Sequence, residues 1–268
     1  MGEVIVITSG KGGVGKTTTT ANIGTALALE GKKVVLIDAD IGLRNLDVVL
    51  GLENRIVYDL VDVVEGTCRL KQALVKDKRF DGMYLLPAAQ TRDKNAVSPE
   101  QMQKLCADLR EQFDFILIDS PAGIEHGFKN AVAGADEAIV VTVPEVSAVR
   151  DADRIIGMLA TYDIQSPLLI INRLRIDLVK RGDMMNIDDT NEILGIDLLG
   201  VVPDDEHIVI STNRGEPVAI DEDSMAGVAF RNIAKRLLGE DIPLMNLDEE
   251  DTFINKIKRL FGINKNTK

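Results

Sequence analysis

The sequence predicts an α/β fold with a mostly parallel sheet that helices flank on both faces. Three observations lead to this prediction. Short runs of Val, Ile and Leu alternate with amphipathic segments along the chain, as strands alternate with covering helices in such folds. These runs are apolar at nearly every position, which indicates strands that are buried on both faces. A glycine-rich string also lies between the first apolar run and the first helical segment.

Composition limits the classes of protein to consider. Of the 268 residues, 45% are hydrophobic and only 4% aromatic, with no Trp, which suits a sheet built from aliphatic side chains. The net charge of −12 argues against nucleic-acid binding by the body of the protein, so we expect no specific nucleic-acid partner. No apolar run approaches the roughly 18 residues of a membrane-spanning helix, and we expect no signal segment.

The glycine-rich string covers residues 9–20. Within it, Gly10-x-x-x-x-Gly15-Lys16-Thr17 has the spacing of the P-loop, in the strand-then-helix context that this motif requires. The glycines allow backbone N–H groups to turn toward phosphate oxygens. The helix that begins near Lys16 adds the positive end of its dipole. The predicted fold is therefore a single-domain P-loop NTPase.

The side chains of this loop have distinct expected tasks. Lys16 is expected to reach the β- and γ-phosphates of a nucleotide, and the Thr17 hydroxyl to ligate Mg²⁺. The residues of the loop that we expect to bind the nucleotide are Gly12, Gly13, Val14, Gly15, Lys16, Thr17 and Thr18.

Lys11 narrows the class of P-loop protein to consider, because a general P-loop accepts any residue at this position. The string Lys11-Gly-Gly-x-Gly-Lys16-Thr17 resembles the deviant Walker A motif of the MinD/ParA superfamily. The resemblance implies ATP and Mg²⁺ as cofactors and a homodimer that forms with ATP, in which Lys11 reaches the ATP of the partner. It also implies ATP hydrolysis, with Lys11, Lys16 and Asp40 as catalytic residues.

Two of the apolar runs end in aspartates. The run over residues 33–38 ends in Asp38-Ala39-Asp40, at the carboxyl end of a strand, where open α/β sheets bind ligands. The run over residues 115–119 is the Walker B pattern, and Asp119 is expected to hold the Mg²⁺ shell. The resemblance implies that Asp40 orients the attacking water and that Asp38 lies near the metal. The expected metal residues are Thr17, Asp38 and Asp119.

The remaining segments complete the predicted sheet and its helices. Ser98-Pro99-Glu100 has the N-cap, first-position proline and first-turn acid that begin a helix. A loop is expected over residues 41–47. Amphipathic segments cover residues 57–64 and 70–75, further strands are predicted over residues 83–87, 137–143, 167–173 and 197–203, and helices over residues 98–111, 144–161 and 224–238.

Polar residues follow two predicted strands that are consecutive along the chain. Asn172 ends one strand and Pro203-Asp204 ends the next. The resemblance implies that they bracket the adenine, with the amide of Asn172 on the base edge and Pro203-Asp204 packed beside it. Arg173 is able to stack its planar guanidinium on the ring. A turn-forming role is the alternative for Asn172, because Asn is common in turns.

The end of the chain is basic and amphipathic. Residues 253–268 hold five Lys or Arg and no acid, as in helices that lie on an anionic membrane surface. A terminal helix docked on the core is the alternative. On the predicted helix Phe253, Ile254, Ile257, Leu260 and Phe261 share one face, Lys256 and Lys258 flank it, and Arg259 lies opposite.

These segments predict the organisation of the whole chain. We expect an ATPase domain over residues 1–245, an acidic linker over residues 246–252 and an amphipathic membrane-targeting helix over residues 253–268. The expected location is the cytoplasm and the inner face of the cell membrane, with anionic lipids as partners.

Two longer strings resemble the MinD branch of the superfamily, namely residues 42–47 (GLRNLD) and 90–94 (QTRDK). The resemblance implies an ATPase that positions the division septum by recruiting the inhibitor MinC, with MinE or another topological regulator as a further partner. It places partner binding on the helix that carries Ser147, Arg150, Asp151 and Asp153.

Three related functions are alternatives. A ParA-type DNA-partition ATPase is expected to have a basic surface and no membrane tail, and a flagellar-number regulator shares the tail. A metal-cluster reductase similar to the nitrogenase iron protein uses cysteines in loops. Here Cys106 lies in the helical stretch 101–111, where we expect a buried structural thiol.

Overall fold

A single sheet organises the chain in this computed structural model, which describes residues 1–93, 96–124 and 126–247. Its eight strands lie in the order β3-β4-β2-β5-β1-β6-β7-β8. All neighbouring strands are parallel except β3 and β4. The strands are β1 (Glu3–Thr8), β2 (Val34–Asp38), β3 (Val75–Lys76), β4 (Met83–Leu86), β5 (Phe115–Asp119), β6 (Glu137–Thr142), β7 (Leu168–Leu174) and β8 (Leu198–Pro203).

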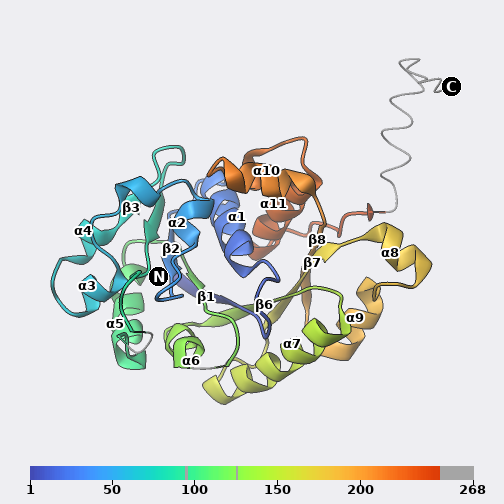
Figure 1. Cartoon of the computed structure of the whole chain (residues 1–268), viewed down its shortest axis with the longest axis horizontal. Coiled ribbons are helices and arrows are strands. Elements are labelled where there is room, and N and C mark those ends of the chain that lie inside the picture. The colour runs from blue at the N-terminus through green and yellow to red at the C-terminus, as the bar shows by residue number, and fades with distance from the viewer. Residues whose placement is uncertain (94–95, 125, 248–268) are drawn as a thin grey trace.

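Helices cover both faces of this sheet (Figure 1). Three short 3₁₀ segments, η1 (Glu53–Arg55), η2 (Ala160–Tyr162) and η3 (Val218–Ile220), join some of them. The α-helices of the described residues are α1 (Lys16–Leu29), α2 (Leu46–Val49), α3 (Leu60–Val64), α4 (Leu70–Ala73), α5 (Pro99–Arg110), α6 (His126–Val132), α7 (Val146–Leu159), α8 (Ile176–Arg181), α9 (Ile187–Leu194), α10 (Glu206–Asn213) and α11 (Met225–Leu237).

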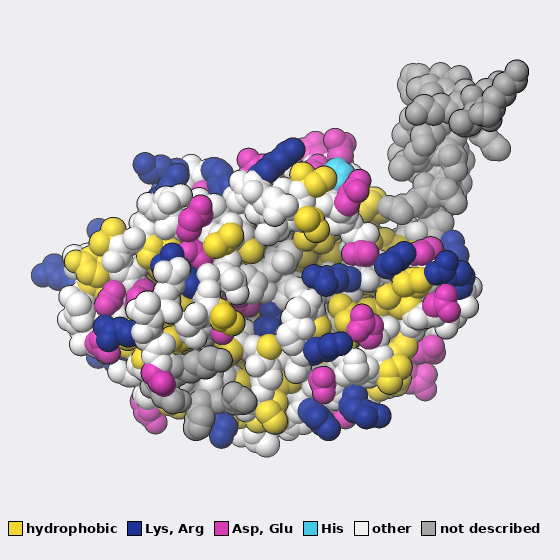
Figure 2. Space-filling model, in the orientation of Figure 1, with side chains coloured by type: hydrophobic (Ala, Val, Ile, Leu, Met, Phe, Trp, Pro, Cys, Tyr) yellow, Lys and Arg dark blue, Asp and Glu magenta, His cyan; other side chains and the backbone are white. Residues whose placement is uncertain are grey.

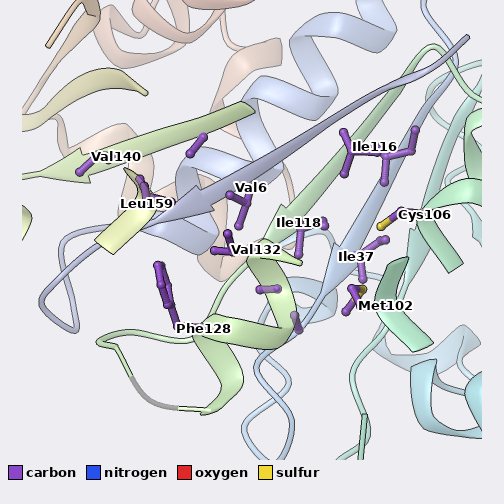
Figure 3. Packing of buried hydrophobic residues seen from close by; sticks show 14 of the residues in the cluster. Val6, Ile37, Met102, Cys106, Ile116, Ile118, Phe128, Val132, Val140 and Leu159 are labelled. Carbon is purple, nitrogen blue, oxygen red and sulfur yellow. The ribbon is translucent and has the colours of Figure 1, made fainter. Parts of the chain in front are cut away.

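The central strand β1 shows how the two cores divide. Val4 and Val6 contribute to one hydrophobic cluster and Ile5 and Ile7 to the other, because successive side chains of a strand point to opposite faces. The first cluster is closed by α3, α5, α6, α7 and α9, and Figure 3 shows Val6 above the side chains of α6. The second is closed by α1, α2 and α11. All four side chains are fully buried, which confirms the prediction from apolar runs.

Local signals set the helix ends where the sequence predicts them. The Ser98 hydroxyl accepts a hydrogen bond from the Gln101 N–H at 3.2 Å, and the Gln101 side chain accepts one from the Ser98 N–H at 2.8 Å. This capping box begins α5. Cys106 is buried within α5, and burial raises the pKa of its thiol to about 12. The prediction of a structural thiol is thus confirmed.

The segment after β2 differs from the prediction. Residues 41–47 were expected as a loop, but α2 begins at Leu46. Both oxygens of the Asp38 carboxylate accept backbone N–H groups here, and one of them holds those of Asn45 and Leu46 at 3.2 Å. The start of α2 is therefore set by a side chain of the preceding strand, which a local pattern does not reveal.

The segment after α11 is fastened to the edge strand β8. The Arg236 guanidinium donates to the carbonyls of Leu199, Ile242 and Pro243 at 2.7–2.9 Å. Met245 packs against both hydrophobic clusters, and Leu247 is buried. The packed body therefore extends to Leu247. The predicted membrane-targeting helix over residues 253–268 lies outside the described residues.

Phe128 of α6 gives a test of the packing. Its ring is 1% exposed and meets the ring of Tyr162 edge to face, with centroids 6.2 Å apart. We expect Phe128→Ala to lower the free energy of unfolding by about 3–5 kcal/mol, because it removes buried contacts and leaves a cavity. Urea denaturation measures this change. Val57→Ala, at a side chain that is 78% exposed, is the control and should change it by less than about 0.5 kcal/mol.

Candidate nucleotide-binding site

The P-loop joins the carboxyl end of β1 to α1 in the middle of the sheet. Gly13 has φ +79° and Gly15 has φ +99°, a left-handed region that only glycine enters at little cost. The Gly15 carbonyl accepts the first helical bond of α1 from the Thr19 N–H at 2.8 Å. The glycines that the motif predicts are thus needed for the turn itself, and the loop leads directly into a helix N-terminus.

Lys16 is the buried cation of the site. Its side chain donates to the Ser9 hydroxyl at 3.0 Å, and the residue is 8% exposed. Burial lowers the pKa of Lys16, while the negative charges of Asp119 and Asp40 oppose that shift. The structure therefore places Lys16, Asp40 and Asp119 together, as the sequence predicts.

Asp119 and Asp38 form the acidic centre. They are register partners across β5 and β2. The pKa of Asp119 is raised to about 8, mainly by burial and further by the negative charge of Asp38. A hydrogen bond from Thr17 and the positive charge of Lys16 act in the opposite direction and lower this pKa. Burial also raises the pKa of Asp38 to about 6. Each carboxylate is thus costly to ionise without an added cation.

The three predicted metal residues lie side by side, with different partners. The Thr17 hydroxyl bonds the Asp119 carboxylate, and the Thr20 hydroxyl lies 3.4 Å from it. Asp38 instead binds the backbone N–H groups of Asp40, Asn45 and Leu46. A hydroxyl and a carboxylate are oxygen ligands that suit Mg²⁺, so Thr17 and Asp119 fit the predicted ion. Asp38 shapes the loop that carries Asp40.

Lys11 contacts the start of α7 in its own chain. Its ammonium lies 3.2 Å from the Glu145 carboxylate and 3.1 Å from the Ser147 hydroxyl. Glu145 was not among the predicted site residues, because it stands 134 positions away in the sequence. Ser147, predicted as a partner-binding residue, holds Lys11 here. Thr20 was missed as well, although its position one helical turn after Lys16 could have suggested it.

The predicted base-binding residues meet at the carboxyl ends of β7 and β8. Leu174 pairs with Pro203, and the Asp204 N–H donates to the Leu174 carbonyl at 3.0 Å. Arg173 is exposed, whereas Asn172 is buried with its amide on the P-loop carbonyl of Val14 at 2.8 Å. A cavity of about 510 Å³ lies beside Pro203 and Asp204.

Helix α7 presents the other predicted partner-binding residues. Arg150 and Asp153 are exposed, and Asp151 is half-buried. Arg150 and Asp153 also line a cavity of about 370 Å³ together with Met185 and Ile193. Such an apolar cavity with a charged rim is a feature of protein-binding surfaces.

The described part of the chain has no group of three or more His, Cys, Asp or Glu side chains that could hold a metal ion by itself. None of its helices has the length and apolarity needed to cross a membrane. On the face shown in Figure 2, basic and acidic side chains are interspersed.

Comparison with known proteins identifies the family. Residues 5–218 match the CobQ/CobB/MinD/ParA nucleotide binding domain. The septum site-determining protein MinD of Bacillus subtilis (strain 168) is 62% identical over 266 residues, which cover 98% of this chain and 99% of that protein. The chain belongs to the MinD family. The resemblance stated from the P-loop and the longer strings is therefore confirmed.

Two solved MinD structures share the fold. A chain of the MinC:MinD cell division protein complex of Aquifex aeolicus is 53% identical, with a TM-score of 0.86 over 91% of this chain and 99% of that chain. The MinD of Pyrococcus horikoshii OT3, complexed with Mg-ADP, is 32% identical, with a TM-score of 0.80 over 90% of this chain and 100% of that chain. The predicted P-loop NTPase fold is thus confirmed.

The buried acidic centre makes stability depend on pH. The pKa of Asp119 rises from its ordinary value of 3.8 to about 8 on folding, so the folded protein binds its proton more tightly than the unfolded chain does. This contribution to stability is complete below pH 4 and is lost as the pH rises toward 8. We expect Asp119→Asn to be more stable than the parental chain at pH 8, and the difference to vanish near pH 4.

Urea denaturation in EDTA, without nucleotide, at several pH values measures this difference. Asp108→Asn, at an exposed position of α5, is the control and should follow the parental curve. An Asp119→Asn variant whose stability stays parallel to the parental curve from pH 4 to 8 would contradict the assignment of the raised pKa to Asp119.

Proposed function

We propose that this chain is a Mg²⁺-dependent, dimerising ATPase that positions the cell-division septum by recruiting the division inhibitor MinC to the membrane. The observation that carries the proposal is one assembled site, with a P-loop, a buried Lys16 and the Thr17–Asp119 pair, in a chain 62% identical to MinD. Two of the alternatives, a flagellar-number regulator and a ParA-type DNA-partition ATPase, have less support.

The site residues divide the work of ATP hydrolysis. The backbone N–H groups of residues 12–18 and the ammonium of Lys16 would bind the phosphates, and Thr17 and Asp119 would hold Mg²⁺, which neutralises developing charge on the phosphates. Asp38 acts from nearby, through the loop it holds. Asp40, half-buried beside them, would orient the attacking water in line with the γ-phosphate.

Lys11 would couple ATP to dimerisation. To reach the ATP of a partner it must leave Glu145 and Ser147, which it contacts in the single chain. Both side chains of the ion pair are largely exposed, at 41% and 56%, and such a pair contributes at most about 1 kcal/mol. The start of α7, which carries these contacts, would therefore change its surroundings when the dimer forms.

MinC is the proposed partner of helix α7. A MinC:MinD complex is known for the Aquifex aeolicus protein, and Arg150 and Asp153 give α7 a charged rim at the cavity that Met185 and Ile193 line. Ser147 and Asp151 of the same helix would add to this surface. MinE or another topological regulator would compete for or adjoin this surface.

The membrane is the proposed place of action. Residues 253–268 would lie on anionic lipid with their apolar face inserted, and each basic residue near such a surface contributes about 1 kcal/mol. Arg236 ties the segment that carries Ile242 to Leu199 of β8, and Leu247 is buried, so we place the start of the linker after Leu247. A dimer would carry two tails and bind by avidity, which joins ATP binding to membrane binding.

Asp40→Ala tests the proposed chemistry. We expect ATP binding and dimerisation to persist and kcat to fall about 100-fold or more, because the water loses its orienting group. Steady-state phosphate release and ATP-dependent gel filtration measure the two properties. Asp108→Ala, at an exposed position of α5, is the control. An Asp40→Ala variant with the parental kcat would exclude this assignment.

Sedimentation with liposomes tests the proposed membrane cycle. We expect the full chain to sediment with phosphatidylglycerol vesicles in ATP, and far less in ADP or without nucleotide. Phe261→Asp, on the predicted apolar face, should weaken binding about tenfold or more, since a buried aromatic is replaced by a charge. Asn255→Asp adds the same charge on the opposite face as the control. Equal sedimentation in all three nucleotide states would refute the coupling.

A further inference from the structure

Asn172 lies at a bulge near the end of β7. Ile171 pairs with Val201 and Leu174 with Pro203, so Asn172 and Arg173 stand where the partner strand has a single residue. Arg173 has φ +54°, a left-handed conformation that is uncommon for a non-glycine residue. The bulge takes Asn172 out of the regular pairing, and its side chain reaches the P-loop, 158 positions away in the sequence.

The amide of Asn172 is satisfied on both sides by backbone groups. Its NH₂ donates to the Val14 carbonyl at 2.8 Å, and its oxygen accepts from the Arg173 N–H at 2.9 Å. Because one partner is an acceptor and the other a donor, only one orientation of the amide fits. Asn172 is 2% exposed, and a hydrogen bond removed from water in this way is strong and costly to leave unmade.

The P-loop is shaped to receive this amide. Gly15 follows Val14, and a Cβ at Gly15 would lie 2.3 Å from the Asn172 nitrogen. The absence of a side chain therefore allows the amide to approach. The peptide between Val14 and Gly15 comes directly before Lys16 and the first turn of α1, so its orientation sets the direction of the N–H groups that face the phosphates.

We propose that Asn172 is a positioning residue that holds the P-loop in its phosphate-binding shape, whether or not it also contacts the base. The proposal rests on the proposed function, because it concerns the same nucleotide site. The affinity for ATP combines two contributions of Asn172, namely its contact with the base and its effect on the shape of the P-loop. A residue that only reads the base contributes nothing to a ligand without a base, whereas a residue that positions the loop contributes to any polyphosphate.

Calorimetric titration with Mg²⁺·ATP and with Mg²⁺·tripolyphosphate tests this. Asn172→Ala leaves the Val14 carbonyl without its partner, and we expect the affinity for tripolyphosphate to fall about tenfold, with at least the same loss for ATP. Asn172→Asp places a carboxylate oxygen against that carbonyl and should weaken tripolyphosphate binding further. The fitted number of sites reports the folded fraction, so a loss of folded protein is separated from a loss of affinity.

Asn130→Ala is the matched control. It removes a bond of the same kind, from the Asn130 amide to the Val97 carbonyl at 2.6 Å on α6, and should leave both affinities unchanged. If Asn172→Ala does not fold, Asn172→Ser takes its place with the same expectation. Parental tripolyphosphate affinity in a folded Asn172 variant overturns the positioning role. A parental chain that binds neither ligand overturns the proposed function instead.

Discussion

The burial of two aspartates side by side is the constraint on which the rest of the site depends. Asp38 and Asp119 face each other in register at the carboxyl ends of β2 and β5, and burial raises the pKa of both. Like charges in a poorly solvated place repel strongly. Lys16 supplies one cation, and the pair remains a place where a divalent ion is electrostatically favoured.

Contacts of Asp38, Lys11 and Asn172 connect the phosphate site to other elements of the fold. Asp38 binds the backbone at the start of α2, so any change in its charge acts on the loop that carries Asp40. Lys11 ties the P-loop to the start of α7 through Glu145, and Asn172 ties it to β7. Side chains of several elements thus contact the P-loop, so a bound triphosphate would affect each of these elements.

Much of the architecture could be predicted because its signals are local. Apolar runs predicted the long strands, and Ser98-Pro99-Glu100 predicted the start of α5. The start of α2 could not be predicted, because the hydrogen-bonding partner that sets it, Asp38, belongs to another element. The short helices α8, α9 and α10 were not predicted, because so few residues do not show a clear hydrophobic periodicity.

The sequence by itself determined the family, the fold and the residues at the chemical centre. The P-loop spacing, Lys11 and the aspartates after apolar runs are patterns within a few positions, and the parallel sheet brings the carboxyl ends of its strands to one edge. Only the tertiary structure decided what these residues touch. Lys11 contacts Glu145 across 134 positions of the sequence, and Asn172 contacts Val14 across 158. Such contacts depend on how distant elements pack, so no local pattern in the sequence predicts them.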